Sequence, residues 1–298
     1  MEEVKIYKLP VTIDLMKSAW EDYKKNWRRL VPISILVVVL GQLLSFLDFY
    51  FVQNLIPAAT YLIQAIFWII SGFFMTLGAV VIIRVLSGKK ESVEKIIRKD
   101  FSLIALLFLM KIAMNLIFVG ALVPLIIPGI ILVIAFSFFS FIVVLEGKKW
   151  IEGLLRSSDM TKGLRWEIFG RYFMFFLWML LFSLPVFILS DFLSAIISIP
   201  EIRVVAPIII TSLAFPFSIG FTQKIYDELN KIRPKSQFKQ SQKGKSLYTF
   251  FLVWGIVLFL IVAIGRFAYP DKKMFDENFL KEKFNIEFTK PIDDIKSI

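Results

Sequence analysis

The stretch LIIPGIILVIAFSFFSFIVVLEGKKW, from Leu125 to Trp150, continues an apolar run that already begins at Phe101. The whole run extends to Leu145, and a helix needs only about 20 apolar residues to cross the hydrocarbon core of a bilayer. The run is about twice that length, so it has to fold back on itself. This pattern predicts a pair of membrane helices joined by a turn.

Proline indicates where the run turns. Pro124 and the turn motif Pro128–Gly129 cannot continue a preceding helix, because proline lacks a backbone N–H and clashes with the turn before it. Proline is tolerated in the first turn of a new helix. We therefore predict a tight, uncharged turn near 124–130 followed by a new helix. A short re-entrant segment is the alternative, if it packs in protein or lines water.

The composition favours a membrane protein over a soluble one. Hydrophobic residues make up 57% of the 298 residues, whereas soluble domains are about 45–50% apolar. The chain has no cysteine and no histidine, which excludes disulfides, zinc–thiolate sites and catalysis by either residue. No pair of carboxylates has the spacing of a membrane active site. The sequence therefore predicts no catalytic residues, no cofactor and no enzymatic activity. No metal site is assigned, although a site built from carboxylates alone stays open.

Apolar runs predict seven membrane spans, at 30–52, 57–85, 101–123, 125–145, 169–192, 204–223 and 247–268. The second, fourth and sixth each follow a proline-containing turn, so the first six are expected to form three helical hairpins. The predicted organisation is all-α and polytopic. It comprises a cytoplasmic amphipathic segment (1–29), a six-helix domain with interfacial helices (30–223), a basic cytoplasmic loop (224–246), the seventh helix (247–268) and a short outer tail (269–298).

Basic residues predict the orientation. The four segments expected on one side carry seven, six, six and seven Lys and Arg, whereas the first two turns on the other side carry none and the third carries only Arg203. Cytoplasmic loops are enriched in these residues, so the N-terminus is predicted to be cytoplasmic and the C-terminus to lie outside. The six lysines of the tail fit this rule poorly. The net charge of +11 is attributed to this bias and to anionic headgroups, not to nucleic acid.

Three basic segments precede the hairpins. In the first, Leu15, Ala19, Trp20, Tyr23 and Trp27 fall near one helical face, and Lys17, Lys24, Lys25 and Arg28 fall near the other. Such a pattern is typical of a helix lying in the membrane interface. An aromatic residue nine positions after a serine recurs in all three segments, at Trp27, Phe101 and Trp166, which suggests a threefold repeat. Gly147, Gly163 and Gly170 are predicted helix stops.

The segments IIPGIILVIAFSFFSFIVVLEG (126–147), LLRSSDMTKGLRWEIFG (154–170) and FTQKIYDEL (221–229) resemble a known family. It is the glycerophosphoryl diester phosphodiesterase membrane-domain family of prokaryotic polytopic proteins. The resemblance covers about residues 10–232 and implies a plasma-membrane location. Some family members add a catalytic barrel of about 250 residues, which is not expected here. No family catalytic residues carry over.

One ionisable residue lies near the middle of a predicted span. Lys111 stands in the third span with Asn115 one turn on, and Gln42 falls at similar depth in the first. Buried charge in a membrane marks a candidate site, here a polar cavity, although a lysine can also extend its ammonium to the interface. Asp48 and Asp191 are candidate outer-face ligands for a cation or a lipid amine.

Three functional hypotheses follow from the sequence. The first is a non-enzymatic membrane scaffold or an accessory of envelope and lipid homeostasis. The alternative is a transporter or lipid-moving protein that uses a cavity around Lys111, and the third is a membrane enzyme. The expected partners are membrane lipids, with anionic headgroups at the basic segments, and a protein that binds the C-terminal tail.

Overall fold

The computed structural model describes residues 9–52, 57–89, 91–122, 126–148, 150–197 and 202–234, with short pieces between 238 and 261. Every regular element within these residues is helical, so the predicted all-α fold is confirmed there. The elements are α1 (Thr12–Val52), α2 (Pro57–Leu86), α3 (Val93–Leu122), α4 (Ile126–Phe136), α5 (Phe139–Phe141), the π-helix η1 (Ile142–Glu146), α6 (Trp150–Thr161), α7 (Arg165–Ile197) and α8 (Ile202–Ile232).

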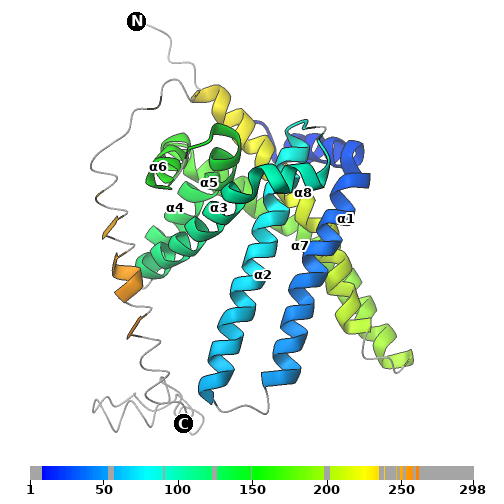
Figure 1. Ribbon diagram of the computed structural model, residues 1–298. Helices are drawn as coiled ribbons and strands as arrows, with labels where there is room; N and C mark the ends of the chain where they lie inside the picture. Colours follow the sequence, from blue (N-terminus) through cyan, green and yellow to red (C-terminus); the bar gives the residue numbers. More distant parts are fainter. Residues whose placement is uncertain are drawn as a thin grey trace, which may run out of the picture.

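Three pairs of consecutive helices pack as antiparallel hairpins: α1 with α2, α3 with the shorter α4, and α7 with α8. These are the pairs expected from the proline-containing turns. The hairpins meet at a common end, at the top of Figure 1, and α1–α2 and α7–α8 diverge from each other below it. The architecture is therefore packed at one end and splayed at the other.

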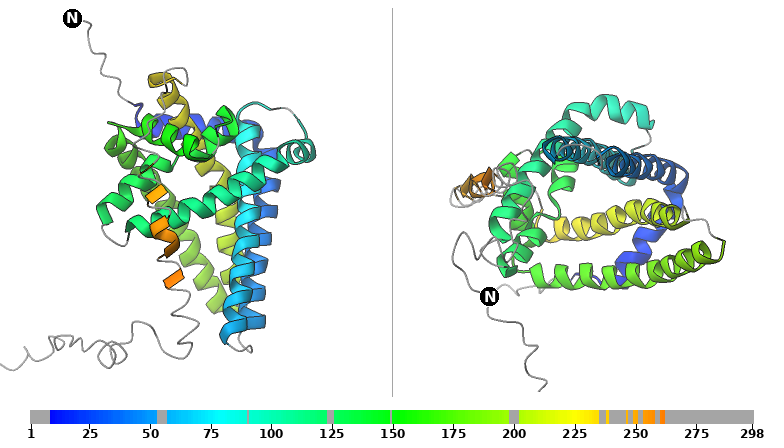
Figure 2. Two further views of the ribbon diagram at one scale, coloured as in Figure 1. Left: turned by 60° about the vertical axis from the view of Figure 1, so that its left-hand side comes forward. Right: turned by 90° about the horizontal axis from the view of Figure 1, so that it is seen from below.

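Helix α1 is 41 residues long and contains most of the predicted amphipathic segment (1–29) together with the first predicted span (30–52). At about 1.5 Å per residue it is roughly twice as long as a bilayer core is thick. Pro32 stands at the junction of the amphipathic and apolar patterns, and proline is a common cause of sharp helix bends. Figures 1 and 2 show the N-terminal part of α1 running across the bundle, over α8 and toward α7, before the helix turns downward.

The apolar core lies at the packed end. Its larger cluster contains residues of every helix from α1 to α8, including η1, and fully buried phenylalanines at 136, 138, 139 and 221. A smaller cluster joins α1, α2 and the start of α3, with Leu30, Val37, Val81 and Ile82 inside it. The packed end therefore carries its own core, independent of any lipid.

The segment predicted as one span at 125–145 is helical from Ile126 to Glu146 but interrupted after Phe136. The helix begins at Ile126, with Pro128 and Gly129 in its first turn, but it ends at Phe136. The amide and hydroxyl of Ser137 both donate to the Ile134 carbonyl, at 3.3 and 2.9 Å, which closes the helix. The interruption lies among fully buried phenylalanines, at 136, 138 and 139. Pro124 lies outside the described residues.

Glycine ends two of the three helices that it was predicted to end. Gly147 (φ 74°) follows η1, and Gly163 (φ 81°) lies in the turn before α7; a left-handed conformation of this kind is one that glycine adopts without strain. After Gly147 the chain reverses sharply, and α6 makes an angle of 120° with the preceding Ile130–Glu146 segment. The prediction was wrong for Gly170, which lies inside α7.

Three described helical stretches are long and apolar enough to cross a membrane: Ile63–Leu86, Arg165–Ser194 and Ala206–Ile232. The bent pair Ile130–Glu146 and Trp150–Thr161 would make a fourth only if its two parts form one broken span. The predicted seventh span (247–268) and the tail lie largely outside the described residues, so neither is tested.

Close packing of α1 on α2 depends on Gly78. A Cβ atom at this position would lie 2.8 Å from a methyl carbon of Val37, whereas a Cβ at Gly170 would meet nothing within 4 Å. Alanine gains about 1 kcal/mol in helix propensity at either site, but overpacking costs about 1–3 kcal/mol. We predict that Gly78→Ala is less stable than Gly170→Ala by about 1–3 kcal/mol in thermal unfolding of the detergent-solubilised protein. Equal stability of the two variants would contradict this packing.

Candidate functional site

The basic segments converge at the packed end, which we call the basic end. Three contacts join segments that are far apart in sequence: Arg29 with the Lys89 carbonyl (3.0 Å), Lys224 with Asp22 (2.5 Å), and Arg171 with the carbonyls of Leu9 and Pro10 (2.5 and 2.9 Å). A fourth contact, between Arg84 and Asp100 at 2.7 Å, links α2 to α3. The four segments that the charge pattern placed on one side therefore lie together.

Arg156 is the centre of the contacts between α6 and α8. Its side chain is fully buried, and its Nη2 atom donates to the side-chain oxygen of Asn230 at 3.0 Å and to the Arg233 carbonyl at 2.7 Å. The Nε atom faces both carboxylate oxygens of Glu146 at 3.4 Å. The Nη1 atom has no hydrogen bond within the described residues and lies 3.7 Å from Asp159. The guanidinium thus holds the ends of η1 and α8 against α6.

Glu146 and Tyr226 complete this network. The Tyr226 hydroxyl donates to Glu146 at 3.0 Å, and its ring stacks on Phe141 at 5.7 Å between centroids. The Arg156 guanidinium also lies 5.9 Å from the ring centre of Phe238. Apart from Nη1 of Arg156, the polar groups described here are hydrogen-bonded to other protein groups, so the arrangement holds structure together and presents no nucleophile or metal ligand set. No acidic cluster able to hold a metal occurs in the described part of the chain.

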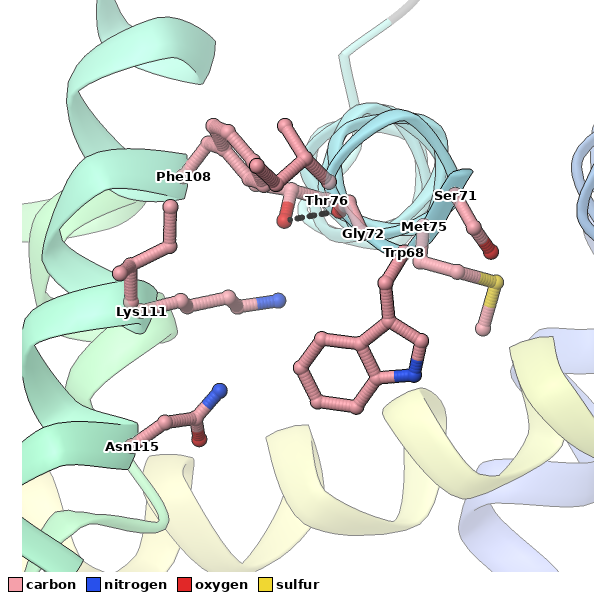
Figure 3. A pocket seen from close by; sticks show the side chains of 10 residues that line it. Trp68, Ser71, Gly72, Met75, Thr76, Phe108, Lys111 and Asn115 are labelled. Carbon is pink, nitrogen blue, oxygen red and sulfur yellow. Dashed lines mark hydrogen bonds between the residues drawn. The ribbon is translucent and has the colours of Figure 1, made fainter. Parts of the chain in front are cut away.

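The predicted polar residues Lys111 and Asn115 share a pocket of about 280 Å³ between α2 and α3. Figure 3 shows both side chains pointing from α3 toward Trp68 on α2. The Thr76 hydroxyl at its edge is engaged with the Gly72 carbonyl at 2.9 Å. Lys111 has no ion-pair partner among the residues that the structure describes. Its ammonium is therefore the main polar group that the pocket could offer to an anion.

The other predicted site residues lie elsewhere. Gln42 is exposed on α1 and does not line the Lys111 pocket. Asp191 is exposed on α7, far along the chain from Asp48 on α1, whose side chain is outside the described part. The Lys111 pocket thus keeps two of its three predicted polar residues.

A larger groove lies where the N-terminal part of α1 crosses α7 and α8. This α1–α7–α8 groove has a volume of about 1110 Å³. Its lining from α1 is Ile13, Met16, Lys17, Trp20, Tyr23, Lys24, Trp27 and Val31. Its lining from α7 and α8 is Trp178, Met179, Phe182, Ser183, Val186, Ile210, Leu213, Ala214 and Phe217. The wall is apolar apart from two lysines, a tyrosine and a serine.

The groove corrects the two-face interpretation of the first segment. Leu15, Ala19 and Tyr23 are buried against protein, but Trp20 and Trp27 are 48% and 52% exposed. Lys17 and Lys24, expected opposite the aromatic residues, line the same groove as those tryptophans. Sequence periodicity did not reveal this arrangement, because α8 covers one side of the helix and leaves lysine and tryptophan together on another.

Neither Arg156 nor the groove was singled out from the sequence. Arg156 stands in LLRSSDM, where it counts as one more basic residue of a cytoplasmic segment. The only signal is its place among the apolar residues of a short amphipathic helix. The groove arises from contacts between segments about 150–200 residues apart in the chain, which local pattern does not encode.

The fold defines an all-helical protein with several helices apolar enough to cross a membrane. A family model described as a domain of unknown function (DUF7847) matches residues 48–222, more than half of the chain, and the protein belongs to that family. No curated protein and no solved structure matches. The resemblance to the phosphodiesterase membrane-domain family is not tested by these comparisons and stays a prediction.

Removing the buried guanidinium should destabilise the basic end strongly. We predict that Arg156→Ala lowers the free energy of unfolding by about 3–5 kcal/mol, because Glu146 would be left buried beside a cavity. The double variant Arg156→Met/Glu146→Gln should recover part of this loss, since neither charge then remains. The measurement is thermal or denaturant unfolding in detergent.

The control is Arg98→Ala, which breaks an exposed pair with Glu94 whose side chains are 80% and 72% exposed. Its loss should be below about 0.5 kcal/mol, as for other exposed helical pairs. If Arg156→Ala behaved like Arg98→Ala, the buried network would not hold the basic end together.

Proposed function

We propose that the protein is a polytopic integral membrane protein of a prokaryotic plasma membrane. In this proposal it is a non-enzymatic scaffold or accessory of envelope and lipid homeostasis, with the basic end in the cytoplasm. The observation that carries the membrane location is the apolar surface of α7.

Helix α7 exposes apolar side chains on every side. In its most apolar 18-residue window only 11% is buried. The consecutive residues Val186, Phe187, Ile188 and Leu189 are 40%, 39%, 65% and 54% exposed. Successive helical residues point about 100° apart, so these four sample the whole circumference. Soluble monomers rarely carry apolar surface of this extent, and lipid is the solvent that would accommodate it.

The basic end supports the proposed orientation. Trp20, Trp27, Trp150 and Trp166 are each about half exposed or more, at 48%, 52%, 54% and 71%, and they occur in the segments that carry the basic residues. Tryptophan is enriched at the membrane–water boundary, and Lys and Arg on its cytoplasmic side. The C-terminal tail is proposed to lie outside, after a seventh span, where it could bind a protein partner.

The pairing of charged groups supports a non-enzymatic role. At the basic end, Arg156 is engaged with Glu146 and Arg84 with Asp100. Catalytic acids and bases need access to a substrate and a place in a cleft. The two cavities described above contain lysines, but neither is lined by an aspartate or a glutamate.

The native chain has no cysteine, so single cysteines report topology directly. We predict that Arg98→Cys, at the exposed basic end, reacts with a membrane-impermeant maleimide only from the cytoplasmic side. Gln53→Cys, in the first predicted outer turn, should react only from outside, and both proteins should fractionate with membranes. Recovery in the soluble fraction, or labelling of both sites from one side, would contradict the proposed topology.

A transporter or lipid-moving protein is the second candidate, and the Lys111 pocket favours it. A lysine without an ion-pair partner in the described structure could attract an anionic substrate. A transport route additionally requires water or substrate access to this pocket from both sides of the membrane.

Labelling of Lys111→Cys separates the two candidates. The scaffold proposal predicts that this site is unreactive, or reactive from the cytoplasm alone, and that Lys111→Met complements a strain lacking the gene. Asn115→Cys, one turn further on α3, is labelled in parallel as a second position in the same pocket. Labelling of both positions from the outer side, together with failed complementation by Lys111→Met, would instead establish transport as the function.

A further inference from the structure

We infer that the α1–α7–α8 groove binds one anionic, two-chain phospholipid from the cytoplasmic leaflet. In this arrangement Lys17 and Lys24 hold the phosphate, and the acyl chains lie along α7 and α8. The inference rests on the proposed membrane location and adds a defined ligand site to it.

The charge of the groove selects an anion. Its lining contains two lysines and no aspartate or glutamate. Lys17 and Lys24 are both exposed, and neither has an ion-pair partner in the described part of the chain. The neighbouring Lys224, in contrast, is paired with Asp22 at 2.5 Å. The groove lining therefore presents positive charge and no acidic side chain, which suits a lipid phosphate.

The spacing of the two lysines suits a single headgroup. They are seven residues apart on α1, which is two helical turns or about 10.5 Å along the axis, and they lie on the same face. Lysine side chains are long and flexible, so both ammonium groups can approach a phosphate between them. Trp20 lies between the lysines in sequence and stacks on Tyr23 with 5.3 Å between ring centres.

Tyr23 offers a neutral polar contact beside the lysines. A tyrosine phenol is protonated at neutral pH, and burial raises the pKa of Tyr23 further above its ordinary value. A protonated hydroxyl can donate a hydrogen bond to phosphate or glycerol oxygens. Trp20 also meets Phe217 of α8 edge-on at 5.9 Å, which fixes the tryptophan at the junction of the polar and apolar parts.

The remaining walls suit acyl chains. Helix α8 contributes Ile210, Leu213, Ala214 and Phe217 at helical spacing, and α7 contributes a facing row that includes Phe182. Phe182 and Leu213 are themselves 65% and 48% exposed, so the groove is accessible from the side. Its volume of about 1110 Å³ exceeds the roughly 300–1,000 Å³ of ordinary small-molecule pockets. A lipid entering laterally from the bilayer fits these features.

The test is native mass spectrometry of the full-length protein, delipidated in a non-ionic detergent and titrated with dioleoyl phosphatidylglycerol or dioleoyl phosphatidylcholine. We expect one phosphatidylglycerol to bind at least tenfold more tightly than phosphatidylcholine. The variant Lys17→Glu/Lys24→Glu should weaken phosphatidylglycerol binding tenfold or more. The control Lys25→Glu/Arg28→Glu makes the same charge change on exposed α1 residues that do not line the groove, and should stay within twofold of the native protein.

A second pair of variants tests the acyl-chain site without changing charge. Ala214→Trp fills the groove and should abolish the binding of phosphatidylglycerol. Ile188→Trp, at an exposed position of α7, should leave that binding unchanged. Monodispersity and thermal unfolding identify any variant that misfolds. If Lys17→Glu/Lys24→Glu misfolds, Lys17→Met/Lys24→Met takes its place. It should also weaken binding tenfold or more.

Three results would overturn the inference. Equal loss of binding in the two charge-reversed variants would indicate diffuse attraction to a basic helix. Unchanged binding in Ala214→Trp would place the lipid elsewhere. A dimer that Ala214→Trp dissociates without any dependence on lipid would make the groove an interface between two copies. Each result differs from failure of the membrane proposal, which would appear earlier as recovery of the protein in the soluble fraction.

Discussion

A single buried guanidinium sets the arrangement of the basic end. Arg156 is completely enclosed, and an ion is stable inside a protein only if nearby groups replace its hydration. The π-helix η1 brings Glu146 to 3.4 Å from it, and α8 brings Asn230 to 3.0 Å. The left-handed turn at Gly147 makes this possible, because it reverses the chain and lays α6 back over η1 and the end of α4. The irregular segment after Phe136 therefore allows η1 and α8 both to contact the guanidinium that Arg156 of α6 carries.

The same arrangement explains why the bundle is closed at one end and open at the other. Both apolar clusters lie toward the basic end, where the hairpins meet. The ion pair of Lys224 with Asp22 and the hydrogen bond from Arg171 to the Pro10 carbonyl lie there too. Farther along, α1–α2 and α7–α8 diverge (Figure 2), and α7 has little protein to cover it. The groove forms at the transition, where the N-terminal part of α1 bridges the two hairpins. Lipid would supply the contacts that protein supplies only at the basic end.

Local sequence predicts the helices well and their interruptions poorly. Apolar length, proline and charge located the three hairpins and the segments that gather at the basic end. They missed the interruption after Phe136, because a run of isoleucine and phenylalanine predicts a continuous helix, whereas the structure places Phe138 and Phe139 (0% and 1% exposed) at a break in it. They also failed at Gly170, which α7 simply accommodates. Lys111 and Asn115 were found because a charge in an apolar run is conspicuous. Arg156 was not found, because a buried arginine in a basic segment looks like its exposed neighbours.

The basic residues of α1 consequently fall into two physical classes that composition alone does not separate. Lys25 and Arg28 are exposed and lie outside the groove, so their attraction to anionic lipid is screened over about 8 Å at physiological ionic strength. Lys17 and Lys24 stand beside a low-dielectric wall of tryptophan and phenylalanine. There the same charges act on a ligand whose acyl chains are confined in the groove. Binding by the first pair is electrostatic alone and should weaken as salt is added, whereas binding at the groove should persist in part, because acyl-chain contacts are not screened by salt. Salt dependence thus distinguishes attraction of the protein to a charged membrane from occupation of one site by one lipid.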